Sequence, residues 1–237
     1  MDKKYPDLRK WISDREESFG NYVVSMLNND ARTLLMAVSM QTPVYVFSGV
    51  IRDFLLKKYV ARDLDMVIRN MGKIEIPISI IGRCSISKNS FGGYKLHTGN
   101  LNIDVWDLNK TWGIEKEHKR GNALSLINSA FFNFSAIVYD YRRRRFLYGE
   151  DFLKFLDNQT MEVVYKENPN QELCIVNSIY YNKKYGFRIG KSLAQWIRDH
   201  YSEKMDFKQT QLKHFGKVLY SDDEIRLFYV MCLYKLM

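Results

Sequence analysis

The chain has 237 residues, of which 46% are hydrophobic and 27% charged, and this composition predicts a globular protein with one large or two small buried cores. Its formal charge of +9 favours a polyanionic partner, since Lys and Arg are spread along the chain and form no charged tail. The three cysteines are odd in number and lie far apart, which excludes a disulfide framework and a zinc-ligand cluster.

The sequence also carries no sign of a membrane or secretory segment. No apolar run approaches the roughly 20 residues that span a bilayer. The N-terminal sequence MDKKYPDLRK has no apolar signal region after its charged residues. We therefore expect a soluble, unprocessed, cytoplasmic protein with no membrane partner.

Several segments show a clear periodicity. Apolar residues at helical spacing between residues 7 and 40 predict helices that pack on a sheet. Four isoleucines at every second position from Ile74 to Ile80 predict an edge strand, because Pro77 in its middle cannot donate to a strand ladder. Residues 94–96 and 101–108 predict a hairpin, since Gly99 and Asn100 permit the positive φ that tight turns need.

The segment 44–69, VYVFSGVIRDFLLKKYVARDLDMVIR, combines these patterns with acidic residues. An apolar run of strand character leads through Ser48-Gly49 into a helical pattern, and Asp63-Leu64-Asp65 then opens a second strand. Side chains alternate along a strand, so Asp63 and Asp65 share one face, about 7 Å apart. Two carboxylates at this separation, beside a strand-to-helix turn, predict a divalent-metal site.

This segment resembles the catalytic signature of the polymerase-β nucleotidyltransferase superfamily, and SGVIRDFLL resembles the GGxVRDxLL of bacterial tRNA nucleotidyltransferases and poly(A) polymerases. The resemblance implies an α+β fold. It consists of a head with a mixed or antiparallel sheet flanked by helices, followed by a small C-terminal helical domain. We assign the head to residues 1–165 and the helical, neck-like domain to residues 166–237.

The resemblance also implies the site residues. Asp63 and Asp65 are the metal ligands that bridge two Mg²⁺ ions, and Asp104, on a strand next to theirs, is the third catalytic carboxylate. Asp107 is the second choice for that third position. Ser48 and Gly49 bind the triphosphate of a nucleoside triphosphate, while Arg52 either contacts the triphosphate or braces its neighbour Asp53.

Two family motifs depart from the pattern here. Residues 129–131 are Ser-Ala-Phe where the family has Arg-Arg-Asp, so the contacts made there do not carry over. In the neck, Asn170, Gln171 and Cys174 stand at the positions of a Glu-Asp-x-x-Arg motif that selects cytosine and adenine in tRNA nucleotidyltransferases. Both the Asp and the Arg of that motif are missing.

These features predict an enzyme that transfers a nucleoside monophosphate from a triphosphate such as ATP to an RNA 3′ end, tRNA being one candidate, without faithful CCA addition. The four arginines 142–145 either contact RNA phosphates or face solvent at a strand pair. Two alternatives stay open for the whole chain. One is nucleotidyl transfer to a protein or small-molecule hydroxyl, and the other is a non-catalytic RNA- or nucleotide-binding module.

Overall fold

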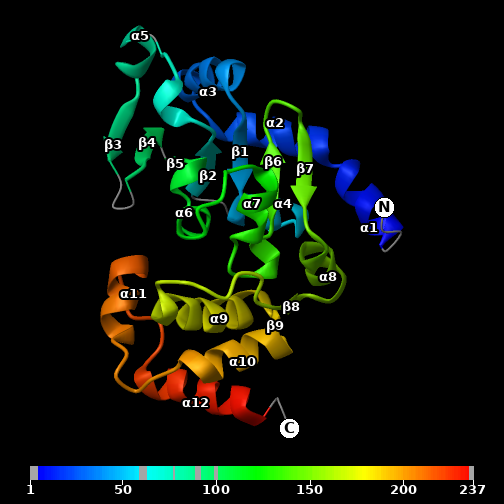
Figure 1. Ribbon diagram of the computed structural model, residues 1–237, viewed down its shortest axis with the longest axis vertical. Helices are drawn as coiled ribbons and strands as arrows, with labels where there is room; N and C mark the ends of the chain where they lie inside the picture. The colour runs from blue at the N-terminus through cyan, green and yellow to red at the C-terminus, as the bar shows by residue number, and fades with distance from the viewer. Residues whose placement is uncertain (1–4, 59–62, 77, 89–91, 99–100, 235–237) are drawn as a thin grey trace. The chain divides into compact units, whose positions relative to one another are not determined.

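The computed structural model describes residues 5–58, 63–76, 78–88, 92–98 and 101–234 (Figure 1). The chain forms two compact units. Unit 1 comprises residues up to Ala130 together with Phe134–Leu153, and unit 2 comprises Phe131–Asn133 and the residues from Lys154 onward. The division into domains 1–165 and 166–237 stays a prediction, because compactness alone does not show where an independently folding domain ends.

Unit 1 is built around a mixed sheet. Its strands are β1 (Val44–Phe47), β2 (Asp63–Ile68), β3 (Ser85–Lys88), β4 (Tyr94–Thr98), β5 (Leu101–Asp107), β6 (Ile137–Asp140) and β7 (Arg145–Tyr148). Their order across the sheet is β3-β4-β5-β2-β1-β6-β7, and every neighbouring pair is antiparallel except β2 and β5, which are parallel. The predicted α+β class with a mixed sheet is confirmed.

Helices surround this sheet. They are α1 (Pro6–Ser13), α2 (Glu16–Met26), α3 (Asn29–Gln41), α4 (Gly49–Leu55), α5 (Ile78–Ile81), α6 (Trp112–Lys116), α7 (Ala123–Asn128) and the first turn of α8 (Glu150–Asn158), with short 3-10 turns η1 (Met71–Lys73), η2 (Leu108–Lys110) and η3 (Asn133–Ser135). The helices predicted before residue 40 are confirmed as α1, α2 and α3.

One face of the sheet is apolar and carries the core of unit 1. Phe19 of α2 is fully buried and packs edge-on against Phe54 of α4 and Tyr139 of β6. Further along the same face, α3 and strands β2 to β5 enclose an apolar cavity of about 390 Å³ that includes Met66 and Val105. The strand alternation sends the neighbours of these residues, Asp65 and Asp104, to the opposite face.

The predicted edge strand at Ile74 to Ile80 is wrong. The described residues of that segment form an irregular stretch and the start of the short helix α5, while the sheet edge is formed by β3, which begins five residues after Ile80. Ile74 and Ile76 are half-buried and line the apolar cavity from this irregular stretch, whereas Ile78 is 87% exposed. Pro77 lies outside the described residues, as does the predicted turn at Gly99-Asn100, but the hairpin of β4 and β5 on either side of that turn is confirmed.

Unit 2 is largely helical. It contains the end of α8, a two-stranded parallel ladder of β8 (Thr160–Met161) and β9 (Arg188–Ile189), and helices α9 (Gln171–Tyr185), α10 (Lys191–His200), α11 (Phe207–Phe215) and α12 (Asp222–Tyr234). This confirms the predicted C-terminal helical region. The ladder is short, because β8 ends at Met161 and Val163 makes only an isolated bridge with Phe132.

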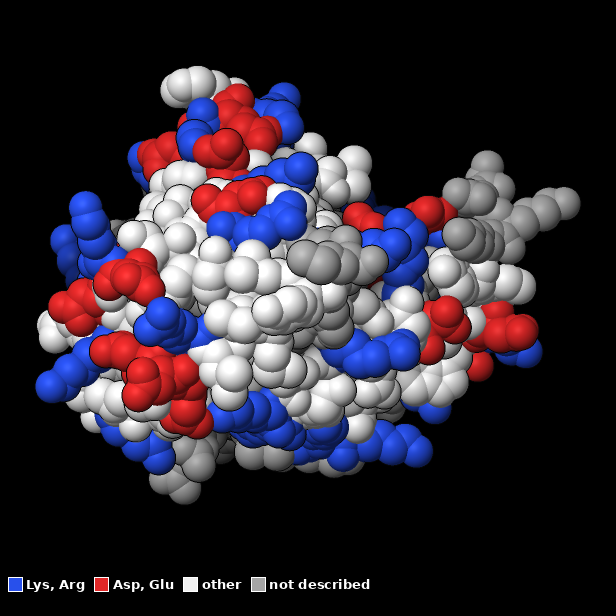
Figure 2. Space-filling view, turned by 90° about the horizontal axis from the view of Figure 1, so that it is seen from below, with Lys and Arg blue, Asp and Glu red and all other residues white. Residues whose placement is uncertain are grey.

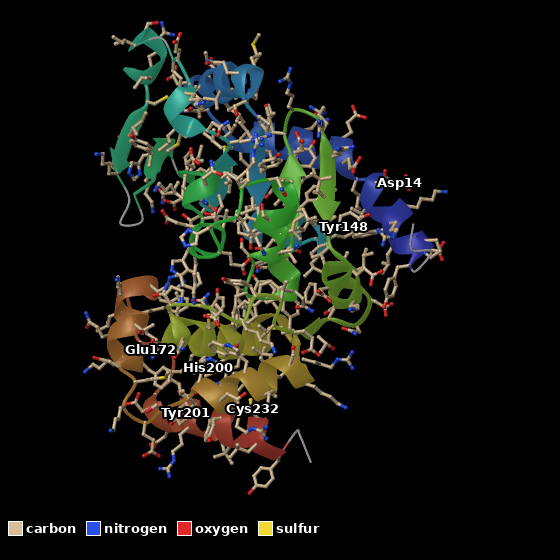
Figure 3. The ribbon with its side chains drawn as sticks, in the orientation of Figure 1. Asp14, Tyr148, Glu172, His200, Tyr201 and Cys232 are labelled. Atoms are coloured by element: carbon tan, nitrogen blue, oxygen red, sulfur yellow. The ribbon has the colours of Figure 1, made fainter. Side chains whose placement is uncertain are left out.

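The core of unit 2 consists of aromatic and aliphatic side chains. Phe155 and Phe187 pack edge to face, with ring centroids 4.8 Å apart. Figure 3 labels Tyr201, directly after α10, and Cys232 of α12. Tyr201 stacks on Tyr229 of α12, and Cys232 is buried. Cys84, Cys174 and Cys232 are free thiols. Among the described residues, no helix has the length and apolar character to cross a bilayer.

A buried glutamine holds the α11–α12 connection. Gln211 is fully buried, its carbonyl oxygen accepts hydrogen bonds from the backbone N–H groups of Leu219 and Tyr220, and its amide donates to the Tyr220 carbonyl. Gln211→Ala should lower the free energy of unfolding by about 3 kcal/mol, because buried backbone groups lose their partners. Urea unfolding monitored by circular dichroism measures this. Gln209→Ala, on the exposed side of α11, should change it by less than about 0.5 kcal/mol, and equal effects would contradict the assigned role.

Candidate active site

The two predicted catalytic strands lie next to each other, and their aspartates face each other directly. In the parallel β2–β5 pair Asp65 is opposite Asp104, and Asp63 is opposite Asn102. Neighbouring strands are about 4.8 Å apart, so the carboxylates of Asp65 and Asp104 come from adjacent points on one face. The predicted placement of Asp104 on a strand beside the Asp-x-Asp strand is confirmed, and the three carboxylates share the face opposite the apolar cavity.

The electrostatics of Asp65 reflect this crowding. Burial raises the pKa of Asp65 to about 7, and the negative charges of Asp104 and Asp63 add to the effect. The positive charge of Lys95 lowers the pKa of Asp65. The Lys95 ammonium lies 3.3 Å from a carboxylate oxygen of Asp104. The site therefore concentrates negative charge that the protein only partly compensates.

The donor set fits a divalent cation. Carboxylate oxygens are the ligands that Mg²⁺ prefers, and Mg²⁺ is commonly held by one or two carboxylates with the remaining positions filled by water and substrate phosphates. Within the described ranges, no three His, Cys, Asp or Glu side chains form a group that could hold a metal ion. The arrangement is thus an open site centred on Asp65 and Asp104, and the joint role of Asp63, Asp65 and Asp104 as ligands stays a prediction.

The turn before α4 is strained at Ser48. Its φ of 58° and ψ of −107° lie in a region that favours glycine, and such a conformation costs on the order of 1–3 kcal/mol in other residues. The Ser48 hydroxyl donates to the Ser135 hydroxyl at 2.8 Å. Gly49 begins α4, and a Cβ there would meet no protein atom closer than the guanidinium of Arg52, at 3.9 Å. Protein packing therefore does not require this glycine, whereas close approach of a ligand would.

Arg52 is engaged inside unit 1. Its side chain is buried and forms an ion pair of 2.7 Å with the equally buried Asp53. The guanidinium also lies over the Phe134 ring, 5.3 Å from its centroid. Of the two roles considered for Arg52, these contacts supply the bracing of Asp53, and a contact with triphosphate stays a prediction.

Asp107 has a structural role. One of its carboxylate oxygens accepts from the backbone N–H of Asn109 at 2.8 Å, and the other accepts from that of Met71 at 2.6 Å. Asp107 thus caps η2 and fixes η1 against β5. This leaves Asp104 as the candidate third carboxylate.

The arginine run divides into two groups. Arg144 donates to the Asn21 side chain and the Glu17 carbonyl, and so binds the β6–β7 turn to α2. Arg142, Arg143 and Arg145 are exposed, and Arg143 lies 3.8 Å from Asp140. The face drawn in Figure 2 carries positive and negative side chains interspersed around an uncharged area. Contact of the exposed arginines with RNA stays a prediction.

The sequence interpretation missed Lys95, although the signal was present. A two-residue turn at positions 99–100 places residue 98 opposite 101 and therefore residue 95 opposite 104, which is the observed register. Lys95, Asp104, Asp65 and Phe47 form one continuous row across four strands. Counting from the predicted turn would have identified Lys95 as the neighbour of the third carboxylate.

In unit 2, the residues aligned with the base-selecting motif differ in their exposure. Cys174 is buried within α9, and desolvation raises the pKa of its thiol far above the usual range. Asn170 is exposed just before α9, and Gln171 is partly buried in its first turn. A buried neutral thiol offers a base no usable donor, so this position does not replace the arginine of the motif.

The fold is similar to that of solved CCA-adding enzymes and tRNA nucleotidyltransferases. It matches a CCA-adding enzyme in complex with CTP, with a TM-score of 0.61, 18% sequence identity, and coverage of 88% of this chain and 53% of that one. It matches the Thermotoga maritima CCA-adding enzyme complexed with tRNA, with a TM-score of 0.60, 17% identity and coverage of 88% and 52%. It also matches a tRNA nucleotidyltransferase complexed with a primer tRNA and an incoming ATP analog, with a TM-score of 0.56, 16% identity and coverage of 70% and 48%.

These likenesses confirm the fold that the sequence resemblance implies. The chain spans about half the length of each matched structure. A scan against protein-family models finds no match, and no curated protein matches in sequence. At 16–18% identity the comparison establishes the arrangement of elements and leaves the activity to be tested.

The raised pKa of Asp65 has a consequence for stability in metal-free solution. The folded pKa lies near 7 and the ordinary value is 3.8, so between these pH values the native state binds a proton that the unfolded chain has released. The free energy of unfolding therefore falls as pH rises from about 4 to about 7. Asp65→Asn removes this loss. Between pH 4 and pH 8 its free energy of unfolding should rise relative to that of the parent by on the order of 2–4 kcal/mol.

Thermal unfolding in EDTA across that pH range measures the difference. Asp157→Asn, at an exposed position of α8, is the control and should show no such gain. If the stability of the parent and that of Asp65→Asn change with pH in parallel, burial and the neighbouring carboxylates do not raise the pKa of Asp65.

Proposed function

We propose that this chain is a template-independent nucleotidyltransferase that transfers a nucleoside monophosphate from a nucleoside triphosphate to the 3′ hydroxyl of an RNA and releases pyrophosphate. The observation that carries the proposal is the register of β2 and β5, which sets Asp65 opposite Asp104 on one face of the sheet. Phe47, the residue before the strand-to-helix turn at Ser48-Gly49, is opposite Asp65, so this turn begins next to the aspartate pair.

Each part of the site has a task in this reaction. Asp65 and Asp104 would hold Mg²⁺ through their carboxylate oxygens, and Asp63 would be the further ligand that the Asp-x-Asp motif implies. When bound, Mg²⁺ supplies activation of the acceptor hydroxyl and stabilises the charge on the phosphoryl and leaving oxygens. The turn at Ser48-Gly49 lets the triphosphate approach the backbone closely, since Gly49 has no Cβ. The buried Arg52–Asp53 pair lies within α4, and the Arg52 guanidinium over the Phe134 ring joins this helix to the segment before β6.

The positive net charge and the fold favour RNA as the acceptor. The formal charge is +9, and nucleic-acid binding gains from neutralised phosphates. Structures of two of the similar proteins hold tRNA, one of them with a primer tRNA and an ATP analog. An RNA 3′ end is thus the acceptor class that we propose, and a cytoplasmic location is the matching expectation.

The test is incubation of the purified protein with total RNA, Mg²⁺ and each α-³²P-labelled nucleoside triphosphate in turn. Label should enter RNA, and Asp63→Asn should abolish its transfer. Label in a protein or a small molecule would show that RNA is not the acceptor. If no acceptor gives metal-dependent pyrophosphate release, the chain is a non-catalytic nucleotide- or RNA-binding module.

The two candidates for the third carboxylate should separate clearly. Asp104→Ala should lower kcat by about a hundredfold or more, because an interaction with the developing charge is lost. Asp107→Ala should lower the melting temperature, since two backbone N–H groups lose their acceptor, while kcat of the folded protein should stay within about threefold of the parent. Steady-state kinetics below both melting temperatures measure this, and the reverse ranking would reject Asp104.

Nucleotide selection should differ from that of CCA-adding enzymes. Gln171 has an amide whose donor and acceptor ends can exchange, and the Cys174 thiol is buried, so neither reproduces the fixed pattern of a carboxylate and a guanidinium. On a tRNA that lacks its terminal CCA, with all four triphosphates present, we expect products without the ordered C-C-A sequence. Sequencing of the product ends measures this, and faithful CCA addition would show that other groups select the base.

A further inference from the structure

The face of the sheet that carries the aspartate pair also carries a lysine. Lys95 on β4 is directly opposite Asp104 on β5, and its ammonium lies 3.3 Å from Asp104 Oδ2. The charge of Lys95 also acts on Asp65, the other member of the aspartate pair. A positive group therefore lies against the carboxylate oxygens that the proposed function assigns to a metal ion.

The ion pair is of a kind that a divalent cation can displace. The two side chains are 35% and 25% exposed, so water screens their attraction. Exposed pairs of this kind contribute little to stability. A divalent cation carries twice the charge and binds carboxylate oxygen at about 2.1 Å, so it competes for Asp104 with an advantage over a lysine ammonium.

We propose that Lys95 is a cation gate: its ammonium holds Asp104 in the metal-free protein and leaves that carboxylate when a divalent cation binds. This inference rests on the metal site of the proposed function and adds a regulation to it. The ammonium balances part of the charge on the empty site and raises the metal concentration that is needed to fill it. Lys95 acts through Asp104, so it is a positioning residue.

The first experiment is titration of the protein with Mn²⁺, in which free Mn²⁺ is measured by electron paramagnetic resonance. Lys95→Gln should bind Mn²⁺ about tenfold more tightly than the parent, because a competing positive charge near the site is removed. Lys88→Gln is the matched control. Ser87 of β3 is opposite Lys95, so Lys88, the next residue along β3, faces the other side of the sheet. Lys88→Gln should change the Mn²⁺ affinity by less than about twofold.

The second experiment observes the lysine directly. Reductive methylation with ¹³C keeps the positive charge and gives each lysine an NMR signal, and the signal of Lys95 is the one that is lost in Lys95→Gln. Addition of Mg²⁺ should move this signal to the position it already has in the Asp104→Asn protein. The Lys88 signal should not move.

The outcomes separate the gate from the proposed function. Equal or weaker Mn²⁺ binding by Lys95→Gln, or a Lys95 signal that ignores Mg²⁺, overturns the gate while the metal site stands. Absence of Mn²⁺ binding in both proteins overturns the gate together with the metal site. Tighter binding by Lys95→Gln supports the gate even where no RNA is extended, in which case the proposed acceptor chemistry alone fails.

Discussion

The site depends on one backbone arrangement, the parallel pairing of β2 with β5 inside a sheet whose other pairs are antiparallel. Parallel ladder bonds place Asp65 opposite Asp104, and the alternation of side chains then sends Leu64, Met66, Ile103 and Val105 to the core. A shift of one residue in either strand would turn the aspartate of that strand into the apolar layer. Burial of the four apolar neighbours therefore fixes the register of the aspartate pair.

A second constraint lies in the turn that follows β1. Ser48 has a backbone conformation that favours glycine, and the surrounding contacts hold it there: its hydroxyl bonds to Ser135, and its carbonyl accepts from the first turn of α4. The buried Arg52–Asp53 ion pair lies one turn further along the same helix. Strain at a candidate ligand-binding turn and buried charge beside it are both costs that a purely structural connection would avoid.

The sequence was sufficient for the parts of the fold that repeat or that carry a composite motif. The strand at Val44–Phe47, the helix after Ser48-Gly49 and the alternation of Asp63 and Asp65 follow from local patterns, and the structure has them. The position of Asp104 beside Asp65 came from the family resemblance, because no local pattern says which strands are neighbours. Strand order is decided by long-range packing, which a single sequence does not display.

The errors have equally specific causes. The isoleucines at 74, 76 and 78 alternate as in a strand, yet none of the described strands pairs with this segment. Ile74 and Ile76 line the apolar cavity from an irregular stretch, and Ile78 begins a short helix. Lys95 was missed because a lysine on a strand has no motif of its own, and only the hairpin register places it opposite Asp104. The buried Gln211 was missed as well, since its role is to satisfy backbone groups of a loop that has no sequence signature.

The parallel pair also determines when the site comes into being as the chain folds. Strands β2 and β5 are separated in sequence by β3 and β4, which occupy the sheet edge beyond β5. The segment after β2 must therefore travel to that edge and return before Asp104 reaches Asp65, and closing such a long loop is slow relative to forming a local hairpin. A nascent chain that has emerged only as far as β4 holds Asp63 and Asp65 but lacks their partner. Under the proposed function, affinity for a divalent cation would then appear only once β5 has paired with β2, and it would not depend on β6 and β7, which follow β5 in the chain.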